Sequence, residues 1–411
     1  MAQTVVIAGT GQGGFQVAAS LRQDGFDGRI VMVGDEPGLP YQRPPLSKAY
    51  LKQDQTPEQV LLRKPPFYEK NDIEVIDGTQ LSAIDRAGRT VTLGSGETLG
   101  YDHLVLAIGA RNRTPPIPGA ELDGVAALRT VAESEALRER LNAASHLMIV
   151  GAGFIGLEVA ATARAAGLDV TVFEATPRVM GRAVTPFISR YFLEHHRATG
   201  IDIRLEAMVA RILDDGGSVA GIETAAGERI EGDLALIAAG VVPNVELAAE
   251  AGLKVENGIC VDDTLLTDDP AISAIGDCAS FHSPFADGPV RFESVQNAVD
   301  QARCVAARLV GKPEPYASVP WFWSDQGALK LQMVGVTGGA DRTVQVGSAD
   351  EAKFSVFCYR GDRFLGAESV NRPGDHMACR RLMTEGIALP AETVAEEGFD
   401  LKTYVKAAVT N

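Results

Sequence analysis

The stretch Val5-Val6-Ile7-Ala8-Gly9-Thr10-Gly11-Gln12-Gly13-Gly14 decides the fold of this 411-residue chain. Its four apolar residues predict a short buried strand, its GxGxxG spacing predicts a tight turn, and Phe15 to Arg22 continues as a helix. In such a turn the first glycine allows the tight bend, the second lets the backbone approach a pyrophosphate, and the third lets the helix pack on the strand. The helix N-terminus then offers free N–H groups and a partial positive charge to phosphates.

The same pattern occurs a second time. Leu147-Met148-Ile149-Val150 runs into Gly151-Ala152-Gly153-Phe154-Ile155-Gly156, and a helical stretch follows. Each copy leads to a second apolar run that ends at an acid, at Asp35 and Glu36 in the first copy and at Glu174 in the second. A carboxylate in this place accepts hydrogen bonds from a ribose. One glycine-rich loop is weak evidence, but the repeated pattern predicts that the chain binds two dinucleotides.

Glu174 also bears on the choice of nicotinamide nucleotide. A carboxylate repels a 2′-phosphate, whereas an NADP site normally offers an arginine in this region. We therefore expect NADH rather than NADPH. Arg178 and Arg182 lie just beyond Glu174 and leave open a phosphate contact or a role as exposed charges at a helix entry.

Two further apolar runs, 102–109 and 233–240, each end at a glycine and predict buried strands of parallel sheets. Proline-containing segments at 113–119 and 241–244 follow them and indicate crossings between domains. The sequence thus predicts an α/β protein with two Rossmann-like dinucleotide-binding domains, the second inserted in the first, and a C-terminal α+β domain. The expected boundaries are 1–112 and 241–315 for the first domain, 113–240 for the second and 316–411 for the third.

The C-terminal part has no nucleotide-binding motif. Its sequence predicts strands at 330–336 and 343–346, and a hairpin in which 353–359 and 363–370 flank Arg360-Gly361-Asp362. A helix is expected from about Asp375 to Thr384. This part is therefore expected to be a capping or interface domain.

Composition and charge restrict the partners. The formal net charge is −16, and 45 % of the residues are hydrophobic, as in ordinary globular proteins. An acidic chain repels phosphate backbones, and no apolar run approaches the ~18 residues that span a bilayer, so we expect neither a nucleic acid nor a membrane as a partner. The first residues lack the basic region of a secretory signal. Five cysteines without CxxC spacing indicate reduced thiols, a cytoplasmic location and no metal site.

Four stretches give the chain a family resemblance. They are Gly9 to Gly14, the RPPLSKAYL stretch at 43–51, the run 267–279 and PWFWSDQ at 320–326. Together they resemble the NADH-dependent ferredoxin reductases of oxygenase systems, which belong to the glutathione-reductase-like flavoproteins with two dinucleotide sites. The RPPLSKAYL stretch is much more specific than a glycine loop, and the four stretches span all three expected domains.

The resemblance implies FAD at the first glycine turn and NADH at the second. Either Asp35 or Glu36 would bind the FAD ribose, and Asp277 would hold a ribityl hydroxyl or cap the following segment. The residues that it assigns to FAD are Gly9, Gly11, Gly13, Gly14, Asp35 or Glu36, Arg43, Lys48, Leu81, Arg129, Asp277 and Val295. Those assigned to NAD are Gly151, Gly153, Phe154, Ile155, Gly156, Glu158, Glu174, Arg182 and Gly240.

Lys48 and Glu158 are the candidate catalytic residues. An ammonium beside the flavin stabilises the negative charge that develops when the ring is reduced. Glu158 lies two residues after Gly156 and is expected to pair with Lys48, which would help to hold the nicotinamide against the flavin. The alternative for Glu158 is a carboxylate that the helix N-terminus simply favours.

The absence of cysteines near the first nucleotide motif bears on the identity of the electron acceptor. Disulfide reductases of this superfamily carry a CxxxxC pair after the first nucleotide motif, but this sequence has no cysteine before Cys260. Cys278 is expected to be a small buried residue. NADH would therefore pass a hydride to FAD, and the flavin would pass single electrons to an outside acceptor. The resemblance implies a [2Fe–2S] ferredoxin that serves a haem monooxygenase or a Rieske dioxygenase.

Docking of an acidic ferredoxin on this acidic chain needs a local basic patch. Candidates are Arg63, Lys64, Arg303, Arg308 and Lys312. The aromatic residues Trp321, Phe322 and Trp323 either line the approach to the flavin or form a core cluster.

Two other functions stay open. The acceptor is a different molecule, such as rubredoxin or monodehydroascorbate, or the protein is a redox-sensing interaction protein that resembles apoptosis-inducing factor. A panel of acceptors distinguishes the first alternative, and rapid bleaching by NADH followed by reoxidation with ferredoxin argues against the second.

Overall fold

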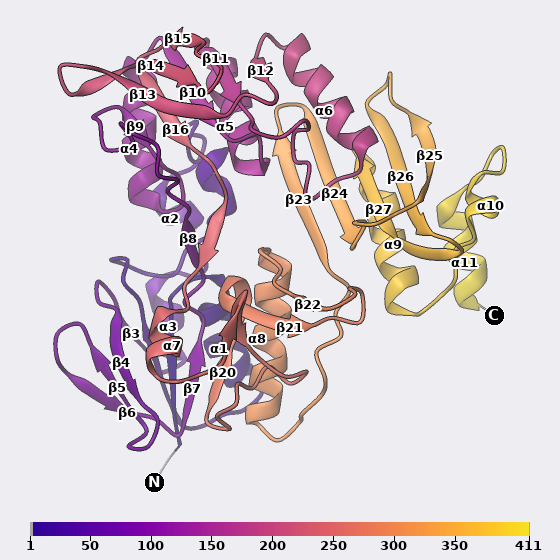
Figure 1. The fold of residues 1–411 in the computed structure, drawn as a ribbon. Coiled ribbons are helices and arrows are strands. Elements are labelled where there is room, and N and C mark those ends of the chain that lie inside the picture. The colour runs from indigo at the N-terminus through magenta and orange to yellow at the C-terminus, as the bar shows by residue number, and fades with distance from the viewer. Residues whose placement is uncertain (1–2, 411) are drawn as a thin grey trace. The chain divides into compact units, whose positions relative to one another are not determined.

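The computed structural model describes residues 3–410, and Figure 1 shows the order of their helices and strands. By its internal contacts the chain forms two compact units. Unit 1 comprises the chain up to Gln42, Pro57–Arg111 and Val242–Pro320, and unit 2 comprises Arg43–Thr56, Asn112–Val241 and the chain from Trp321 onward. The crossings occur in β8 (Ala110–Asn112) and β17 (Val241–Pro243), close to the two crossings expected from sequence.

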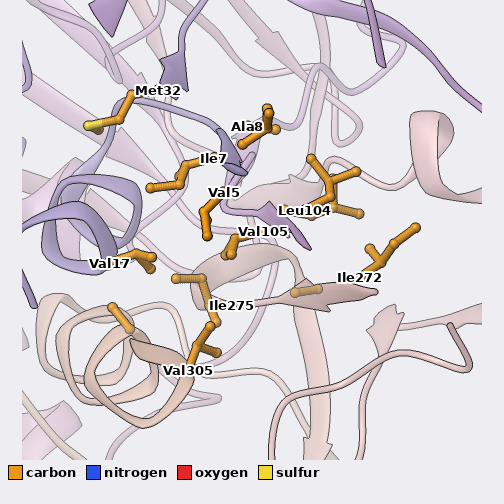
Figure 2. Packing of buried hydrophobic residues seen from close by; sticks show 14 of the residues in the cluster. Val5, Ile7, Ala8, Val17, Met32, Leu104, Val105, Ile272, Ile275 and Val305 are labelled. Carbon is orange, nitrogen blue, oxygen red and sulfur yellow. The ribbon is translucent and has the colours of Figure 1, made fainter. Parts of the chain in front are cut away.

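Unit 1 is built on a parallel sheet with the strand order β20-β7-β1-β2-β3. The strands are nearly continuous apolar runs because both faces of the sheet are covered. Figure 2 shows the resulting core, in which Val17 of α1 and Val305 of α8 belong to the same buried cluster as Ile7 of β1. The elements are β1 (Thr4–Ala8), α1 (Gln12–Gln23), β2 (Arg29–Val33), β3 (Ile73–Ile76), β7 (His103–Leu106), β20 (Ile272–Ala274) and α8 (Val295–Leu309).

Two small antiparallel or mixed sheets and short helices complete unit 1. Strands β4 to β6 form a meander, and a second sheet has the order β18-β19-β21-β22. The bounds are α2 (Pro57–Val60), α3 (Pro65–Lys70), β4 (Leu81–Asp85), β5 (Thr90–Leu93), β6 (Thr98–Gly100), α7 (Glu246–Glu250), β18 (Val255–Glu256), β19 (Gly258–Cys260), η2 (Gly276–Cys278), β21 (Ala279–His282) and β22 (Pro289–Val290).

Unit 2 contains a second parallel sheet, with the order β12-β11-β10-β16-β9. Strand β10 leads through the second glycine turn into α5, as β1 leads into α1. A three-stranded meander, β13 to β15, joins β12 to β16. The elements are η1 (Pro44–Ser47), β9 (Val125–Ala126), α4 (Val131–Ala143), β10 (His146–Val150), α5 (Phe154–Ala165), β11 (Asp169–Phe173), α6 (Pro186–Ala198), β12 (Asp202–Arg204), β13 (Val209–Asp215), β14 (Ser218–Thr224), β15 (Arg229–Glu231) and β16 (Leu234–Ile237).

The C-terminal part of unit 2 is an antiparallel sheet with the order β23-β24-β27-β26-β25 and helices α9 to α11 (Figure 1). The predicted hairpin is present as β26 and β27, and the predicted helix begins slightly earlier, at Pro373. The bounds are β23 (Trp321–Gln326), β24 (Leu329–Gly335), β25 (Arg342–Ser348), β26 (Lys353–Arg360), β27 (Arg363–Val370), α9 (Pro373–Thr384), α10 (Ala391–Val394) and α11 (Leu401–Thr410).

The α/β class with two Rossmann-like units and a C-terminal α+β part is confirmed. Within residues 3–410, no helix combines the length and the apolar character that crossing a membrane requires.

Candidate functional site: two dinucleotide turns and a buried ion pair

The first glycine turn can only be made by glycine at two of its positions. Gly9 has φ +111°, and a Cβ there would lie 2.2 Å from the carbonyl oxygen of Ala107. A Cβ on Gly14 would lie 1.9 Å from the carbonyl oxygen of Gly9. At Gly11, by contrast, no described atom lies within 4 Å of an added Cβ, so the space above this residue is open. The turn is therefore closed on the side of the sheet and open toward a ligand.

The second glycine turn has the same geometry. Gly151 has φ +109°, a Cβ on Gly156 would lie 2.2 Å from the carbonyl oxygen of Gly151, and the space at Gly153 is open with respect to the described atoms. The two turns therefore have matching positions that tolerate only glycine and matching open positions.

The helices that follow the two turns start without a side-chain cap. Gly11 is the N-cap of α1 and Gly153 that of α5, and in the described part of the chain no side chain accepts a hydrogen bond at either cap. In contrast, Thr130, Thr185 and Ser294 cap α4, α6 and α8 with their hydroxyl groups. The first-turn N–H groups of α1 and α5 are thus left to an anion. Both turns fit the pyrophosphate of a dinucleotide.

The acids predicted to bind a ribose are placed differently in the two units. Glu174 directly follows β11, and its carboxylate accepts hydrogen bonds from the backbone N–H of Ala152 at 2.8 Å and from the Thr176 hydroxyl at 2.7 Å. In unit 1, Gly34 directly follows β2, and a Cβ there would lie 2.1 Å from Oγ1 of Thr10. An acid cannot stand at that position without displacing Thr10.

The two candidate acids of unit 1 therefore come later in the chain. Asp35 is exposed, whereas Glu36 is half-buried and accepts a hydrogen bond from the Tyr41 hydroxyl. Both stay candidates for the FAD ribose.

Arg178 and Arg182, which follow Glu174 in the chain, contact different parts of unit 2. The guanidinium of Arg178 donates to the carbonyl oxygen of Gly181 at 2.7 Å, which lies in its own loop. Arg182 is exposed, and its Nη2 lies 3.5 Å from where a Cβ on Gly240 would be. Arg182 and Gly240, both predicted NAD residues, are therefore neighbours.

Lys48 and Glu158 form the predicted ion pair, with 2.8 Å between Nζ and Oε2. Glu158 is 3 % exposed and lies in the first turns of α5, just after the second glycine turn. The same Oε2 accepts a hydrogen bond of 2.5 Å from the Ser47 hydroxyl, and Oε1 accepts one of 2.6 Å from the Ser324 hydroxyl. This buried carboxylate therefore has a cation and two hydroxyl donors, which compensate the loss of water around it.

The segment that carries Lys48 is bound to the helices of unit 2. Hydroxyl groups of Ser134 in α4 and Thr162 in α5 donate to the carbonyl oxygens of Leu46 and Ser47, at 2.8 and 3.2 Å. Tyr50 is fully buried, and its hydroxyl donates to Glu135 of α4 at 2.6 Å. Ser47 and Ser324 lie in two of the stretches that carry the family resemblance, but the resemblance did not assign them a role. Ser134 and Thr162 have no signal in the sequence, because a single hydroxyl residue in a helix has no distinctive pattern.

The other predicted FAD residues are divided between the units. Gly9, Gly11, Gly13, Gly14, Asp35, Glu36, Leu81, Asp277 and Val295 belong to unit 1, and Arg43, Lys48 and Arg129 belong to unit 2. Within unit 2 the Arg43 guanidinium donates to the carbonyl oxygen of Arg129 at 2.7 Å, which brings two of these candidates together. All predicted NAD residues belong to unit 2.

Asp277 is held by its neighbours in unit 1. Gly276 has φ +72°, and its N–H donates to Oε1 of the fully buried Gln301 at 2.7 Å. Val295 is the first residue of α8, whose N-cap is Ser294. The role of these residues at FAD stays a prediction.

The aromatic residues of β23 are partly exposed and do not form a closed core. The ring of Phe322 lies 4.7 Å from that of Phe154, a predicted NAD residue, and the Arg380 guanidinium lies 4.4 Å from the Trp321 ring. Phe322 therefore contacts the start of α5, while Trp321 packs against α9.

The cysteines of the described residues form no disulfide. All five cysteines are free thiols, and Cys278 is fully buried, which raises its pKa to about 11.

The expectation that Arg308 belongs to an exposed basic patch is wrong. Arg308 is half-buried and directs its guanidinium to Ser273 and His103 inside unit 1, whereas Arg63, Lys64, Arg303 and Lys312 are exposed.

Comparison with known families agrees with this geometry. Residues 3–302 match the family described as pyridine nucleotide-disulphide oxidoreductase, and residues 321–405 match the family described as reductase C-terminal. The chain belongs to the pyridine nucleotide-disulphide oxidoreductases. It is therefore an oxidoreductase, although it lacks the cysteine pair of the disulfide-reducing members.

Similar proteins share almost the full length of this pyridine nucleotide oxidoreductase. Rhodocoxin reductase of Rhodococcus erythropolis is 52 % identical over 98 % of this chain and 94 % of its own length. The crystal structure of the ferredoxin reductase for the CYP199A2 system of Rhodopseudomonas palustris has a TM-score of 0.96 at 51 % identity, with 99 % of this chain and 100 % of that chain covered. Putidaredoxin reductase in its covalent complex with putidaredoxin has a TM-score of 0.96 at 40 % identity, covering 100 % and 99 %.

Proposed function

We propose that this protein is an NADH-dependent ferredoxin reductase that contains FAD and supplies electrons to an oxygenase system. The observation that carries the proposal is the ion pair between Lys48 and the buried Glu158 at the start of α5, in a chain with two dinucleotide turns and no cysteine before Cys260. The pair places a cation in the part of the chain that binds the second nucleotide. The missing cysteines leave no internal disulfide as an acceptor.

FAD and NADH are the cofactors. Gly9, Gly11, Gly13 and Gly14 fit the FAD pyrophosphate, and the equivalent glycines of the second turn fit that of NADH. Bound FAD accepts the electron pair of NADH and releases single electrons, which nicotinamide itself does not do. The carboxylate of Glu174, fixed beside the second turn, favours the ribose diol of NADH over a 2′-phosphate.

Lys48 acts as the fixed cation of the site, and Glu158 holds it. Because Glu158 is buried and the Lys48 side chain is only 20 % exposed, the attraction of the ammonium for developing negative charge is less screened than at the surface. We propose the same three-domain division for this function as the sequence predicts, with the FAD domain in two segments around the NADH domain and a separate C-terminal domain.

The proposed acceptor is a [2Fe–2S] ferredoxin. Its support is that one similar structure is titled a ferredoxin reductase for the CYP199A2 system, and that putidaredoxin reductase was crystallised as a covalent complex with putidaredoxin. We also propose a cytoplasmic location, where NADH is available and where the five unpaired thiols stay reduced.

The deciding experiment is an acceptor panel with purified holoprotein. NADH should bleach the flavin absorbance rapidly, and a [2Fe–2S] ferredoxin should restore it faster than rubredoxin or monodehydroascorbate at equal concentration. Faster turnover with rubredoxin would change the acceptor. Slow bleaching together with an NADH-dependent change in assembly would instead favour a redox-sensing interaction protein.

A further inference from the structure

A buried line of hydrogen bonds runs from α6 through β23 to the Lys48–Glu158 pair. Nε2 of His196 lies 2.7 Å from Oε1 of Gln326, and Nε2 of Gln326 lies 3.1 Å from Oγ of Ser324. Oγ of Ser324 lies 2.6 Å from Oε1 of Glu158. All four side chains are at most 3 % exposed, so water does not supply alternative partners.

The bonds of this line are consistent with one direction, from His196 to Glu158. Burial lowers the pKa of His196 and favours the neutral ring, and the tautomer with its proton on Nε2 donates to the Gln326 carbonyl. That orientation turns the Gln326 amide N–H groups toward Ser324. Because Oγ of Ser324 then accepts from Gln326, its own hydrogen is free to donate to the Glu158 carboxylate, which can only accept.

The opposite orientation of the Gln326 amide would break this line. The amide oxygen would then face Ser324 and attract its hydroxyl hydrogen, and Oε1 of Glu158 would lose its donor. The observed amide orientation therefore matches a proton on Nε2 of His196 and leaves the Ser324 hydrogen for Glu158.

Ser324 holds the oxygen of Glu158 that Lys48 does not use. Oε2 is shared by Ser47 and Lys48, and within residues 3–410 Ser324 alone binds Oε1. A glutamate carboxylate bound at both oxygens cannot rotate about its Cγ–Cδ bond without losing a hydrogen bond. Without Ser324, Glu158 is fixed at only one oxygen.

We infer that Ser324 is a positioning residue for electron transfer: through Glu158 it fixes the Lys48 ammonium, so that the C-terminal sheet takes part in tuning the site. This inference rests on the proposed function, in which Lys48 stabilises the reduced flavin. It assigns β23 a role beyond covering the neighbouring parts of unit 2, since one of its side chains determines where the cation stays.

Ser324→Ala tests the inference, and Ser355→Ala is its matched control. Ser355 is also a fully buried serine of the C-terminal sheet, and its hydroxyl donates to a carboxylate, Asp375, at 2.7 Å. Both variants therefore lose the same kind of bond, but only one loses it at Glu158. Ser324→Thr retains the hydroxyl and serves as the conservative variant.

Two readouts are needed on the FAD-loaded proteins. We expect Ser324→Ala to slow flavin reduction by saturating NADH about tenfold, as loss of a hydrogen bond to a charged group does. We also expect a more negative flavin reduction potential, measured with redox dyes and without NADH, because a less fixed ammonium stabilises the reduced ring less. Ser355→Ala should leave both quantities at the wild-type value, and Ser324→Thr should restore most of the rate.

The outcomes separate the inference from the proposed function. If the wild-type protein takes up no FAD or is not reduced by NADH, the proposed function fails and the inference fails with it. If the wild type passes electrons to ferredoxin while Ser324→Ala matches it in rate and potential, only the inference is overturned. Should Ser324→Ala not fold, Ser324→Cys, which replaces the hydroxyl by a much weaker donor, must lower both the rate and the potential, and an unchanged Ser324→Cys overturns the inference.

Discussion

The two dinucleotide units have the same backbone and different chemistry. Gly9 and Gly151 have φ +111° and +109°, and both parallel sheets place the glycine turn after their central strand. Two residues after the last glycine, however, unit 1 has Gln16 and unit 2 has Glu158. Gln16 donates to Ser20 of its own helix at 2.9 Å, whereas Glu158 binds three groups from other elements.

The two units share the backbone of the glycine turn but not the side chains around the helix that follows it. Glycine sterics fix the turn in both units, because the clashing atoms are backbone atoms of the same unit. The ionic site arises only in unit 2, where the segment with Lys48 and strand β23 reach the start of α5. The two copies therefore share a backbone and differ in what packs against the helix that follows the turn.

The largest expected effect comes from the shared backbone. Gly14→Ala places a Cβ 1.9 Å from a backbone oxygen that cannot move away, so we expect unit 1 to lose about 3 kcal/mol of stability and the protein to lose FAD. Gly11→Ala is the control, because no described atom lies within 4 Å of its Cβ. It should fold normally and lower FAD affinity only. Urea unfolding and the flavin content of the purified variants check both expectations, and equal stability of the two variants would show that the turn relaxes.

The next effect tests the chemical difference between the units. Lys48→Ala should slow flavin reduction by NADH about a hundredfold, the typical loss on removing one preorganised charge or donor, while the protein keeps its FAD. Gln16→Ala, at the position equivalent to Glu158, should leave the rate unchanged. Stopped-flow reduction measures both rates, and a normal rate in Lys48→Ala would remove the catalytic role of the ion pair.

A third difference concerns acid stability. His103 begins β7 in unit 1, and the strand registers place Leu234 of β16 at the equivalent position of unit 2. Burial and the nearby Arg308 lower the pKa of His103 from 6.5 to about 3, so the folded protein keeps the ring neutral. Below pH 6.5 the unfolded chain binds a proton that the folded chain does not, and stability present above this pH is lost as the pH falls toward about 3.

His103→Leu should therefore reduce the acid sensitivity. From pH 7 to pH 5 the wild type is expected to lose about 2 kcal/mol through this residue, and His103→Leu should lack that part of the loss. Urea unfolding at pH 7 and at pH 5 gives the loss of unfolding free energy for each protein. The contributions of the other histidines cancel when the two losses are compared. Equal losses in both proteins would mean that His103 is protonated in the folded state.

The smallest effect distinguishes the acids that follow the second strands. Glu174→Ser should lower kcat/KM for NADH about tenfold and raise the relative use of NADPH, because the carboxylate no longer binds the ribose or repels a phosphate. Asp35→Asn and Glu36→Gln change the other unit and should lower FAD retention without changing the nucleotide preference. Steady-state kinetics with both nucleotides measures this, and an unchanged preference in Glu174→Ser would refute the role of Glu174.

Much of the fold could be predicted because its signals are local. The strand, glycine turn and helix lie within about twenty residues of each other, and the hairpin of β26 and β27 is closed by a short turn. The Lys48–Glu158 pair could be predicted only through the family resemblance, since 110 positions separate the two residues. The inward orientation of the Arg308 side chain could not be predicted from sequence. An arginine on a helix is normally interpreted as a surface charge, and only the structure shows that the buried Ser273 and His103 face it.

The sequence by itself determined that the chain has two dinucleotide turns and no cysteine near the first, because glycine sterics act between chain neighbours and an absent side chain is absent in any fold. Only the tertiary structure decided how Glu158 is held. Its serine donors are 111 and 166 positions away in the chain, and a hydroxyl becomes a specific partner only when packing removes water and leaves one carboxylate within its reach.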